Sequence, residues 1–385
     1  MFSRRITLTR LMMLLSFIGL SLFANTAHAV TNPAGFKISR GINLSHWLSQ
    51  DFGWVPREIA LTENDLRFIA SCGFDHVRLP IDEKEMWTED GAPNEDAFAF
   101  LLKGIGWAHA NNLRVIVDLH TVRAHHFNAV NEGGAPNTLW SDPAAQQNFL
   151  FLWKELSQRL RQFPVDALAY EIMNEPVADD HDDWNKLINA AHQLIRAEEP
   201  NRVLIFGSNL WQIPSTLPFL KVPEGDKNII LSTHTYSPLL FTHYRANWTP
   251  LKVYTGPVNY PGAVVDRKTL DQLLKGAPKN FSDIAANAAD VWGPERLREE
   301  LAPAIQRAKE LGLQLYCGEF GCLPTVPRAD RLAYYRDIID VFEDAGMAWA
   351  NWEYKGDFGI FEWFSEQTMT GAPDTELIDT LMHRR

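Results

Sequence analysis

The chain has 385 residues, of which 46% are hydrophobic and 22% charged, and this composition excludes a disordered or filamentous protein. Its formal net charge of −12 argues against a nucleic-acid partner, because such a partner favours a basic face. Thirteen tryptophans are many for this length, and each offers flat apolar area with one hydrogen-bond donor. They indicate either bulk in the core or platforms for flat ligands.

The amino-terminal segment has the pattern of a secretory signal peptide. Basic residues open the chain, an apolar run over 11–23 follows that is too short to cross a bilayer, and Ala-His-Ala at 27–29 fits a cleavage site. We therefore predict a signal peptide over 1–29 and a mature domain over 30–385 that is secreted or periplasmic, without membrane contact after cleavage. An uncleaved membrane anchor is the alternative.

Three cysteines are too few, and an odd number, for a disulfide framework. A pair between Cys317 and Cys322 across a turn stays open, but buried free thiols fit better. The chain has no CxxC pair and no HExxH sequence, so we predict neither a metal site nor another cofactor.

Short apolar runs recur along the chain with amphipathic segments between them. The runs lack two-residue alternation, which is typical of parallel strands buried on both faces. Eight such strands alternating with helices predict a single-domain (β/α)8 TIM barrel. An open doubly wound sheet is the alternative, but it favours a glycine-rich turn after its first strand, and this chain has none there. The runs lie at 38–44, 76–80, 113–120, 165–175, 202–208, 229–236, 313–320 and 347–352.

Helix signals stand between several of these runs. Thr62, with Asp65 three residues later, has the pattern of a capping box, and Gly73 is placed to end that helix. Asp142 and Pro143 open a longer amphipathic segment. Two more helices are expected over 295–311 and 328–345.

An extended loop is predicted after the sixth strand. The stretch 237–291 contains no element that its pattern identifies, although it is rich in aromatic residues. Because long loops in compact domains are usually functional, we expect it to shape a binding cleft at the top of the barrel.

Polar and aromatic residues gather where the predicted strands end. In a barrel these carboxyl ends converge on one pocket. Burying arginine, glutamate and histidine together is costly unless they pair or form hydrogen bonds, so a site is expected there. The residues are Arg78, His120, Asn174, Glu175, His234, Tyr236, Glu319 and Trp352.

Two carboxylates, Glu175 and Glu319, end the fourth and seventh predicted strands on roughly opposite sides of the ring. A pair of carboxylates flanking one bond is what glycoside cleavage needs: one protonates the leaving oxygen, and the other attacks the sugar or activates water. The two groups need different pKa values. Arg78 and Tyr236 are placed to donate to Glu319 and keep it ionised. Asn174 is a candidate for the sugar 2-hydroxyl.

The order of these motifs resembles glycoside hydrolase family 5, the cellulase-type family of retaining (β/α)8 glycosidases, over residues 40–352. The resemblance implies that Glu175 is the general acid/base and Glu319 the nucleophile. It places Arg78 and Tyr236 beside the nucleophile and His234 close to the acid/base. The glycone sugar would be bound by His120 and Asn174 and would stack on Trp352.

The opening segment 40–47 is similar to the branch that holds exo-1,3-glucanases and some bacterial endoglucanases. Members of that branch often carry Gly-Gly where this chain has Ser45-His46, and an Ala-Pro-Gly loop where it has residues 121–125. Both departures lie near the substrate, so the linkage and the sugar stay open.

We therefore predict a monomeric retaining β-glycosidase that cleaves β-1,4- or β-1,3-glucan by double displacement, without metal or cofactor. A transglycosylase with the same site is the alternative, with Trp211, Phe241, Tyr244 and Trp248 as candidates for an aromatic acceptor site. A non-catalytic glycan-binding barrel would tolerate loss of either carboxylate. A barrel aldolase would need a strand-end lysine, and Lys355 is the candidate.

Overall fold

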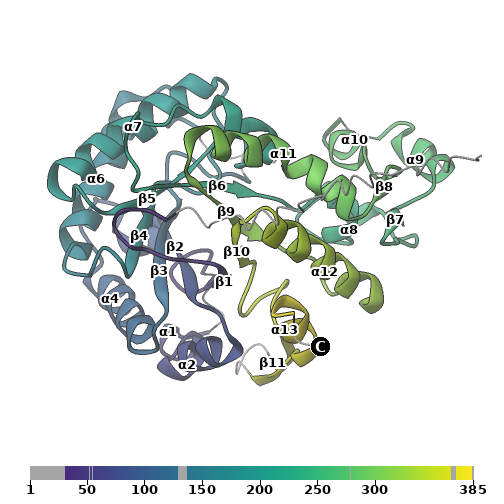
Figure 1. Cartoon of the computed structure of the whole chain (residues 1–385), viewed down its shortest axis with the longest axis horizontal. Coiled ribbons are helices and arrows are strands. Elements are labelled where there is room, and N and C mark those ends of the chain that lie inside the picture. Colours follow the sequence, from purple (N-terminus) through teal and green to yellow (C-terminus); the bar gives the residue numbers. More distant parts are fainter. Residues whose placement is uncertain are drawn as a thin grey trace, which may run out of the picture.

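Eight parallel strands close into a barrel in the order β1-β10-β9-β6-β5-β4-β3-β2 (Figure 1). The computed structural model describes residues 31–51, 53, 55–128, 137–277, 279–365 and 370–383. The predicted (β/α)8 barrel is thus confirmed. Its strands are β1 (Arg40–Asn43), β2 (His76–Asp82), β3 (Arg114–Thr121), β4 (Leu168–Glu171), β5 (Val203–Gly207), β6 (Ile229–His234), β9 (Gln314–Phe320) and β10 (Ala348–Asn351).

The strands are buried on both faces, as their unbroken apolar runs predict. Every residue of β2, β4, β5, β6 and β10 is buried, because helices cover the outside of the barrel and side chains fill its interior (Figure 1). The helices that cover the barrel include α2 (Glu63–Cys72), α4 (Glu95–Ala110), α6 (Pro143–Leu160), α7 (His181–Glu198), α11 (Pro294–Leu311) and α12 (Arg328–Asp344).

The predicted fourth strand is too long at its carboxyl end. Pairing of β4 with β3 stops at Glu171, and the chain then turns, so that Glu175 has a left-handed φ of 43°. The backbone N–H of Glu175 donates to the side chain of Gln212 at 3.0 Å instead of to a neighbouring strand. Glu175 therefore lies on a loop just above the strand.

The helix ends follow the capping signals. Thr62 and Asp65 form the expected capping box at α2, and Gly73 ends that helix in the left-handed conformation, with φ of 100°. The Asp142 side chain accepts a hydrogen bond from the backbone of Ala144 at the start of α6. The predicted helices over 295–311 and 328–345 are confirmed as α11 and α12 within one residue at each end.

The stretch after β6 is not an irregular loop: it folds into a small unit beside α11 and α12, and the prediction of a structureless loop was wrong (Figure 1). Most of its elements are too short for periodicity to reveal them, although the helix over Arg267–Leu274 has an apolar face and Asp266 as its N-cap, a signal that the sequence reading missed. Aromatic packing holds the unit together, since the rings of Phe241 and Tyr260 lie 5.5 Å apart and both are buried. The Tyr260 hydroxyl also donates to Asp337 of α12 at 2.8 Å. The elements are α8 (Leu239–Thr242), η2 (Pro250–Val253), β7 (Gly262–Ala263), α9 (Arg267–Leu274), α10 (Lys279–Ala285) and β8 (Val291–Trp292).

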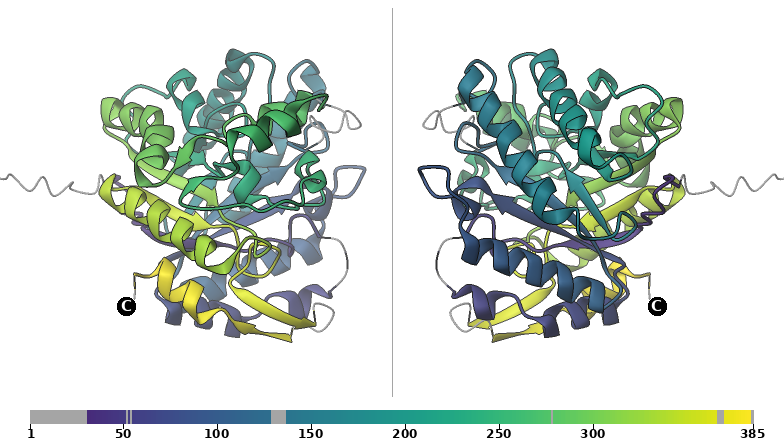
Figure 2. Two further views of the ribbon diagram at one scale, coloured as in Figure 1. Left: turned by 90° about the vertical axis from the view of Figure 1, so that its right-hand side faces the viewer. Right: turned by 90° about the vertical axis from the view of Figure 1, so that its left-hand side faces the viewer.

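A carboxyl-terminal hairpin and helix pack against the start of the chain. The hairpin strands are β11 (Phe361–Ser365) and β12 (Thr370–Pro373), and α13 (Thr375–Leu381) follows. Figure 2 shows the hairpin beside the first helices, where the Phe361 and Phe68 rings lie 5.7 Å apart. The remaining short elements are α1 (Arg57–Ala60), α3 (Glu83–Met86) and η1 (Pro214–Phe219).

All three cysteines are buried and none of them forms a disulfide, so Cys317 and Cys322 do not pair. Among the helices of the described residues, none combines the length and the apolar character needed to cross a bilayer. The predicted signal peptide over 1–29 lies outside the described residues.

Candidate active site

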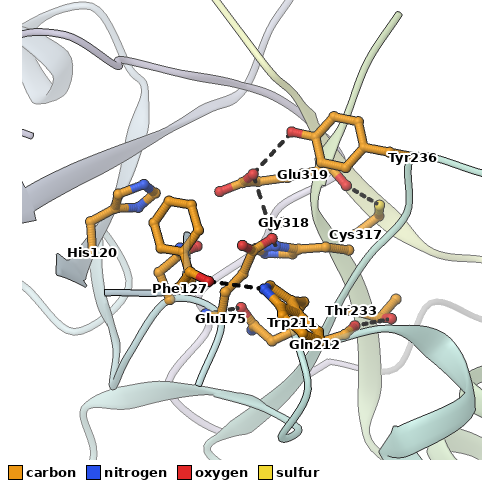
Figure 3. A network of polar contacts seen from close by, with 12 residues as sticks. His120, Phe127, Glu175, Trp211, Gln212, Thr233, Tyr236, Cys317, Gly318 and Glu319 are labelled. Carbon is orange, nitrogen blue, oxygen red and sulfur yellow. Dashed lines mark hydrogen bonds and ion pairs between the residues drawn. The ribbon is translucent and has the colours of Figure 1, made fainter. Parts of the chain in front are cut away.

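Glu175 and Glu319 face each other at the carboxyl end of the barrel (Figure 3). One carboxylate oxygen of Glu175, one of Glu319 and one ring nitrogen of His234 all lie within 4.8 Å of one another. The three residues line a cleft of about 1630 Å³ that also contains Trp352. Two carboxylates so far apart in sequence thus border a single gap of sugar size.

Arg78 is fully buried beneath this gap and contacts three carboxylates. Its guanidinium donates to Glu319 Oε1 at 2.7 Å and to Glu171 Oε2 at 2.6 Å, and lies 3.0 Å from Asp118 Oδ2. It also donates to the side-chain oxygens of Asn43 and Asn174. Such a multidentate arrangement fixes Glu319 in position.

The sequence predicted the contact of Arg78 with Glu319 but not the other two carboxylates. The available signals were Glu171 within an otherwise apolar strand and Asp118 two residues before His120. With Glu175, four carboxylates surround one arginine, so they cannot all ionise at low cost. Burial raises the pKa of Asp118 to about 7 against the pull of Arg78, and it raises the pKa of Glu171 as well.

The two facing glutamates have unlike surroundings. Burial raises the pKa of Glu175 well above its ordinary value, and the charge of Glu319 adds to that shift. Burial also raises the pKa of Glu319, but Arg78, and a hydrogen bond from the Tyr236 hydroxyl at 3.0 Å, oppose the increase. Glu175 is therefore the member of the pair that retains a proton, and Glu319 the member that ionises first.

His234 and Tyr236 are held in their uncharged forms. Burial keeps the pKa of His234 well below its ordinary value, and its Nδ1 lies 2.9 Å from Glu175 Oε1. Burial raises the pKa of the Tyr236 hydroxyl, so it stays a donor to Glu319. Position 318 has to be glycine, because a Cβ there would lie 2.8 Å from Nε2 of His234.

Of the three residues predicted to bind the sugar, His120 and Trp352 line the cleft, and Asn174 lies against Arg78. The His120 ring stacks on Trp352 with centroids 5.5 Å apart and an interplanar angle of 8°. Its Nδ1 lies 2.8 Å from Asp118 Oδ2, and burial lowers its pKa to about 4. Within the described part of the chain, His120 Nε2 and Asn174 Nδ2 have no hydrogen-bond partner. Both groups are thus available to sugar hydroxyls.

Gln212 is a site residue that the sequence did not indicate. Its side chain accepts the Glu175 N–H and donates to Glu171 Oε1 at 3.2 Å, and its carbonyl accepts from the backbone of His234 at 2.9 Å (Figure 3). The side chain fits only because residue 207 is glycine: a Cβ there would lie 1.7 Å from Gln212 Nε2. Residues 210–212 all have left-handed φ values near 55°, so this loop is tightly specified.

We expect Gln212→Leu to lower kcat about 10- to 100-fold, because the Glu175 N–H and Glu171 lose a buried partner, each at a cost of about 1–3 kcal/mol. The measurement is kcat against pH, since displacement of Glu175 also moves the alkaline limb. Gln162→Leu, at an exposed glutamine, is the control. Wild-type kcat and pH profile in Gln212→Leu would show that the network does not position Glu175.

The candidates for an aromatic acceptor site and for a Schiff-base lysine differ in whether they reach the cleft. Phe241 and Tyr244 are buried in the unit after β6, whereas Trp211 and Trp248 line the cleft. Lys355 Nζ lies 2.7 Å from Asp65 Oδ1, so this amine is engaged in an ion pair and is a poor Schiff-base nucleophile.

A parallel barrel whose cleft presents two opposed carboxylates fits a glycoside hydrolase. The family model of cellulase, glycosyl hydrolase family 5, matches residues 31–357, and the chain belongs to this family. It is accordingly a glycoside hydrolase.

Relatives cover almost the whole domain. Endoglucanase C of Acetivibrio thermocellus is 32% identical over 327 residues, which are 83% of this chain and 92% of that protein. Cellodextrinase A of Ruminococcus flavefaciens is 30% identical over 315 residues, or 81% of this chain and 84% of the relative. The crystal structure of an endoglucanase from Thermotoga maritima superposes with a TM-score of 0.70 at 24% identity, covering 90% and 98% of the two chains, and supports the fold.

Proposed function

We propose that this protein is a retaining endo-β-glucanase that cleaves β-1,4-linked glucan, with Glu319 as nucleophile and Glu175 as general acid/base. The spacing of the two carboxylates carries the proposal. Retaining enzymes hold the pair about 5–5.5 Å apart, whereas inverting enzymes need about 6.5–9.5 Å to admit a water. Oxygens within 4.8 Å of each other fit the retaining distance.

In the first step, ionised Glu319 attacks the anomeric carbon while protonated Glu175 gives its proton to the departing oxygen. The bond from the anomeric carbon to that oxygen breaks, and a glycosyl ester with Glu319 forms. Arg78 and Tyr236 hold Glu319 in line for this attack. The Asn174 amide is placed to bind the 2-hydroxyl, a contact that strengthens in the transition state.

In the second step, Glu175 removes a proton from water, which attacks the anomeric carbon and releases Glu319. His234 Nδ1, 2.9 Å from Glu175 Oε1, holds the carboxyl group through both changes of protonation. The sugar leaves with its original anomeric configuration, because two inversions cancel.

The relatives and the cleft support the proposed substrate and mode of attack. Endoglucanase C and Cellodextrinase A are named for internal cleavage of glucan and for action on cellodextrins. The cleft reaches from His46, after β1, past the glutamates to Trp248 and Ile284 of the unit after β6. Space on both sides of the scissile bond supports attack within a chain.

The proposal is tested on soluble β-1,4- and β-1,3-glucans by following viscosity, reducing ends and, by NMR, the first anomer formed. We expect a rapid fall in viscosity on the β-1,4-glucan and a β-anomeric product. An α-anomer would contradict retention, and release of only short products without loss of viscosity would contradict internal attack. Products longer than an oligosaccharide substrate would instead indicate glycosyl transfer.

We expect EDTA to leave the activity unchanged. The residue types of a metal site are present in Glu175, His234 and Glu319. However, the guanidinium of Arg78 lies 2.7 Å from Glu319, and its positive charge would repel a metal cation. The check is the rate after dialysis against EDTA, with and without added Zn²⁺ or Ca²⁺. Loss of activity in EDTA with recovery on adding metal would contradict this scheme.

The pattern of segment 1–29 supports secretion out of the cytoplasm. We also propose that the mature enzyme is a monomer. Mass spectrometry of the amino terminus of the exported protein and its mass in solution test both points. Cleavage after Ala29 and a single-chain mass are the expected results.

A further inference from the structure

The loops after β4 and β5 lie side by side and run in opposite directions. Three contacts join them, and their order along 175–178 is the reverse of their order along 209–212. This is the order of an antiparallel ladder, although β4 and β5 themselves pair in parallel. The joined pairs are Glu175 with Gln212 at 3.0 Å, Pro176 with Trp211 at 3.3 Å, and Ala178 with Asn209 at 2.8 and 2.9 Å.

The side chain of Asn209 forms the far end of this ladder. Its Oδ1 accepts from the backbone N–H of Ala178 at 2.8 Å, and its Nδ2 donates to the Ala178 carbonyl at 2.9 Å. A carboxamide carries a donor and an acceptor in one plane, as a peptide group does, so it can pair with both backbone groups of one residue. Both residues are buried, so water does not readily replace Asn209 as the partner.

Both loops have backbone conformations that need support from their surroundings. Glu175 has a φ of 43°, and residues 210–212 have φ values of 54–58°. The left-handed region is costly for residues with a side chain, and such conformations persist where neighbouring contacts determine them. Asn209 is itself fixed, because the Thr216 hydroxyl donates to its carbonyl at 2.7 Å. The ladder thus holds one costly loop conformation against another.

Asn209 acts on the loop that carries Glu175 without touching the substrate, since it does not line the cleft. It holds this loop three residues after Glu175, on the side that leads into α7. Gln212 holds the N–H of Glu175, so without Asn209 the loop would be tied to its neighbour mainly at one end. The position of the Glu175 carboxyl group would then vary, and a displacement of about 1 Å can cost ~10²-fold in rate.

We infer that Asn209 is a positioning residue for Glu175, which it keeps in reach of the leaving oxygen by pairing with the backbone of Ala178. The inference rests on the proposed function, in which Glu175 is the general acid. Because Asn209 acts on the acid and not on Glu319, its loss should slow the departure of leaving groups that need a proton and spare those that do not. A phenol needs this proton, whereas 2,4-dinitrophenolate is stable as an anion.

The test compares kcat/KM for phenyl β-cellobioside with kcat/KM for 2,4-dinitrophenyl β-cellobioside. This parameter reports the steps up to the glycosyl-enzyme, so the later role of Glu175 as a base does not enter. We expect Asn209→Ala to lower kcat/KM about 10- to 100-fold for the phenyl glycoside and less than about threefold for the dinitrophenyl glycoside. In a Glu175→Gln background, Asn209→Ala should cause little further loss on the phenyl glycoside, because Asn209 acts through Glu175.

Asn32→Ala is a matched control. The Asn32 side chain also pairs with both backbone groups of one residue, because it donates to the Phe36 carbonyl at 2.6 Å and accepts from the Phe36 N–H at 3.0 Å. It is buried as well, but it lies beside the starts of β6 and β9, at the opposite end of the barrel from the cleft. This variant should leave the ratio of the two kcat/KM values unchanged.

Equal losses on the two glycosides in Asn209→Ala, or no loss, overturn the inference while the proposed function stands, if Glu175→Gln shows the selective loss on the phenyl glycoside. If Glu175→Gln lacks that selective loss, the assignment of Glu175 as general acid fails and the inference fails with it. Circular dichroism checks the fold of each variant. Should Asn209→Ala not fold, Asn209→Ser, which keeps one hydrogen-bonding group, carries the same comparison with the same outcomes.

Discussion

Glutamine in place of Glu175 or Glu319 is expected to lower kcat on β-glucan by at least ~10³-fold. Glutamine keeps the size of either side chain but can neither attack the anomeric carbon nor transfer a proton. The measurement is kcat on soluble glucan for purified variants. Glu199→Gln is the matched control, since Glu199 is a buried glutamate that pairs with Arg202 away from the cleft. Turnover near the wild-type rate in either active-site variant would overturn the assignment.

Azide separates the two roles of the glutamates. In Glu175→Ala the glycosyl-enzyme still forms from an aryl glycoside with a good leaving group, and azide entering the vacated side should give a β-glycosyl azide. In Glu319→Ala azide takes the place of the nucleophile and should give the α-glycosyl azide. NMR of the products identifies the anomer of the glycosyl azide. An α-azide from Glu175→Ala and a β-azide from Glu319→Ala would mean that the roles of the two glutamates are reversed.

The pH profile follows from the same pair. In the proposed mechanism Glu175 has to be protonated and Glu319 ionised, so kcat/KM is expected to fall as the pH rises through the raised pKa of Glu175 and as the pH falls below the pKa of Glu319. With a good leaving group, Glu175→Gln should lose the alkaline limb and keep the acid one. Persistence of the alkaline limb would place that pKa on another group.

Arg78→Met is expected to lower the free energy of unfolding by about 3–5 kcal/mol, the usual cost of removing one partner from a buried ion pair. Arg78 is fully buried against Asp118, Glu171 and Glu319, and no other arginine or lysine of the described residues forms an ion pair with these three. The variant should also lose most activity, because Glu319 would no longer be held ionised. Urea unfolding and kcat on glucan measure the two effects.

The stability loss should depend on pH with a defined sign. Without Arg78, the three carboxyl groups have folded-state pKa values raised further above the unfolded values near 4. Below about pH 4 the carboxyl groups are protonated in both states, so their raised pKa values do not reduce the free energy of unfolding. As the pH rises toward the folded-state pKa values, the free energy of unfolding falls, because the unfolded chain releases protons first. The difference from wild type should therefore be small at pH 4.5 and large at pH 7.5.

Arg202→Met provides the comparison, since Arg202 is equally buried but pairs with the single carboxylate Glu199. It should destabilise the fold with a weaker pH dependence and leave kcat unchanged. If Arg78→Met does not fold, Arg78→Lys keeps the charge without the planar fork and should retain the fold with reduced kcat. A pH-independent loss in Arg78→Met would contradict the electrostatic account.

The barrel was predicted from the sequence because its strands depend on local pattern, and the eight candidate site residues were selected because they stand at or near the ends of the predicted strands, although Arg78 lies inside β2. Unbroken apolar runs require strands buried on both faces, and a polar residue at the end of such a run has to lie at the open end of the barrel. Capping at Thr62 and Gly73 works within a few residues of backbone and was predicted correctly. The fold of 239–292 was not predicted, because apart from α9 its elements are very short, and aromatic contacts such as that of Phe241 with Tyr260 hold them together.

The sequence by itself determined the strand count and the family resemblance, but it extended the fourth strand to Glu175, whereas β4 ends at Glu171. Only the tertiary structure decided that Arg78 contacts Asp118 and Glu171 as well as Glu319, that Gln212 bridges the loops after β4 and β5, and that His46 pairs with Glu353. These contacts join residues from different strands and loops, and they depend on barrel closure and loop conformation. Contacts between residues that are far apart in the sequence produce no periodic pattern along the chain. The charged contacts of the cleft could therefore be identified only from the tertiary structure.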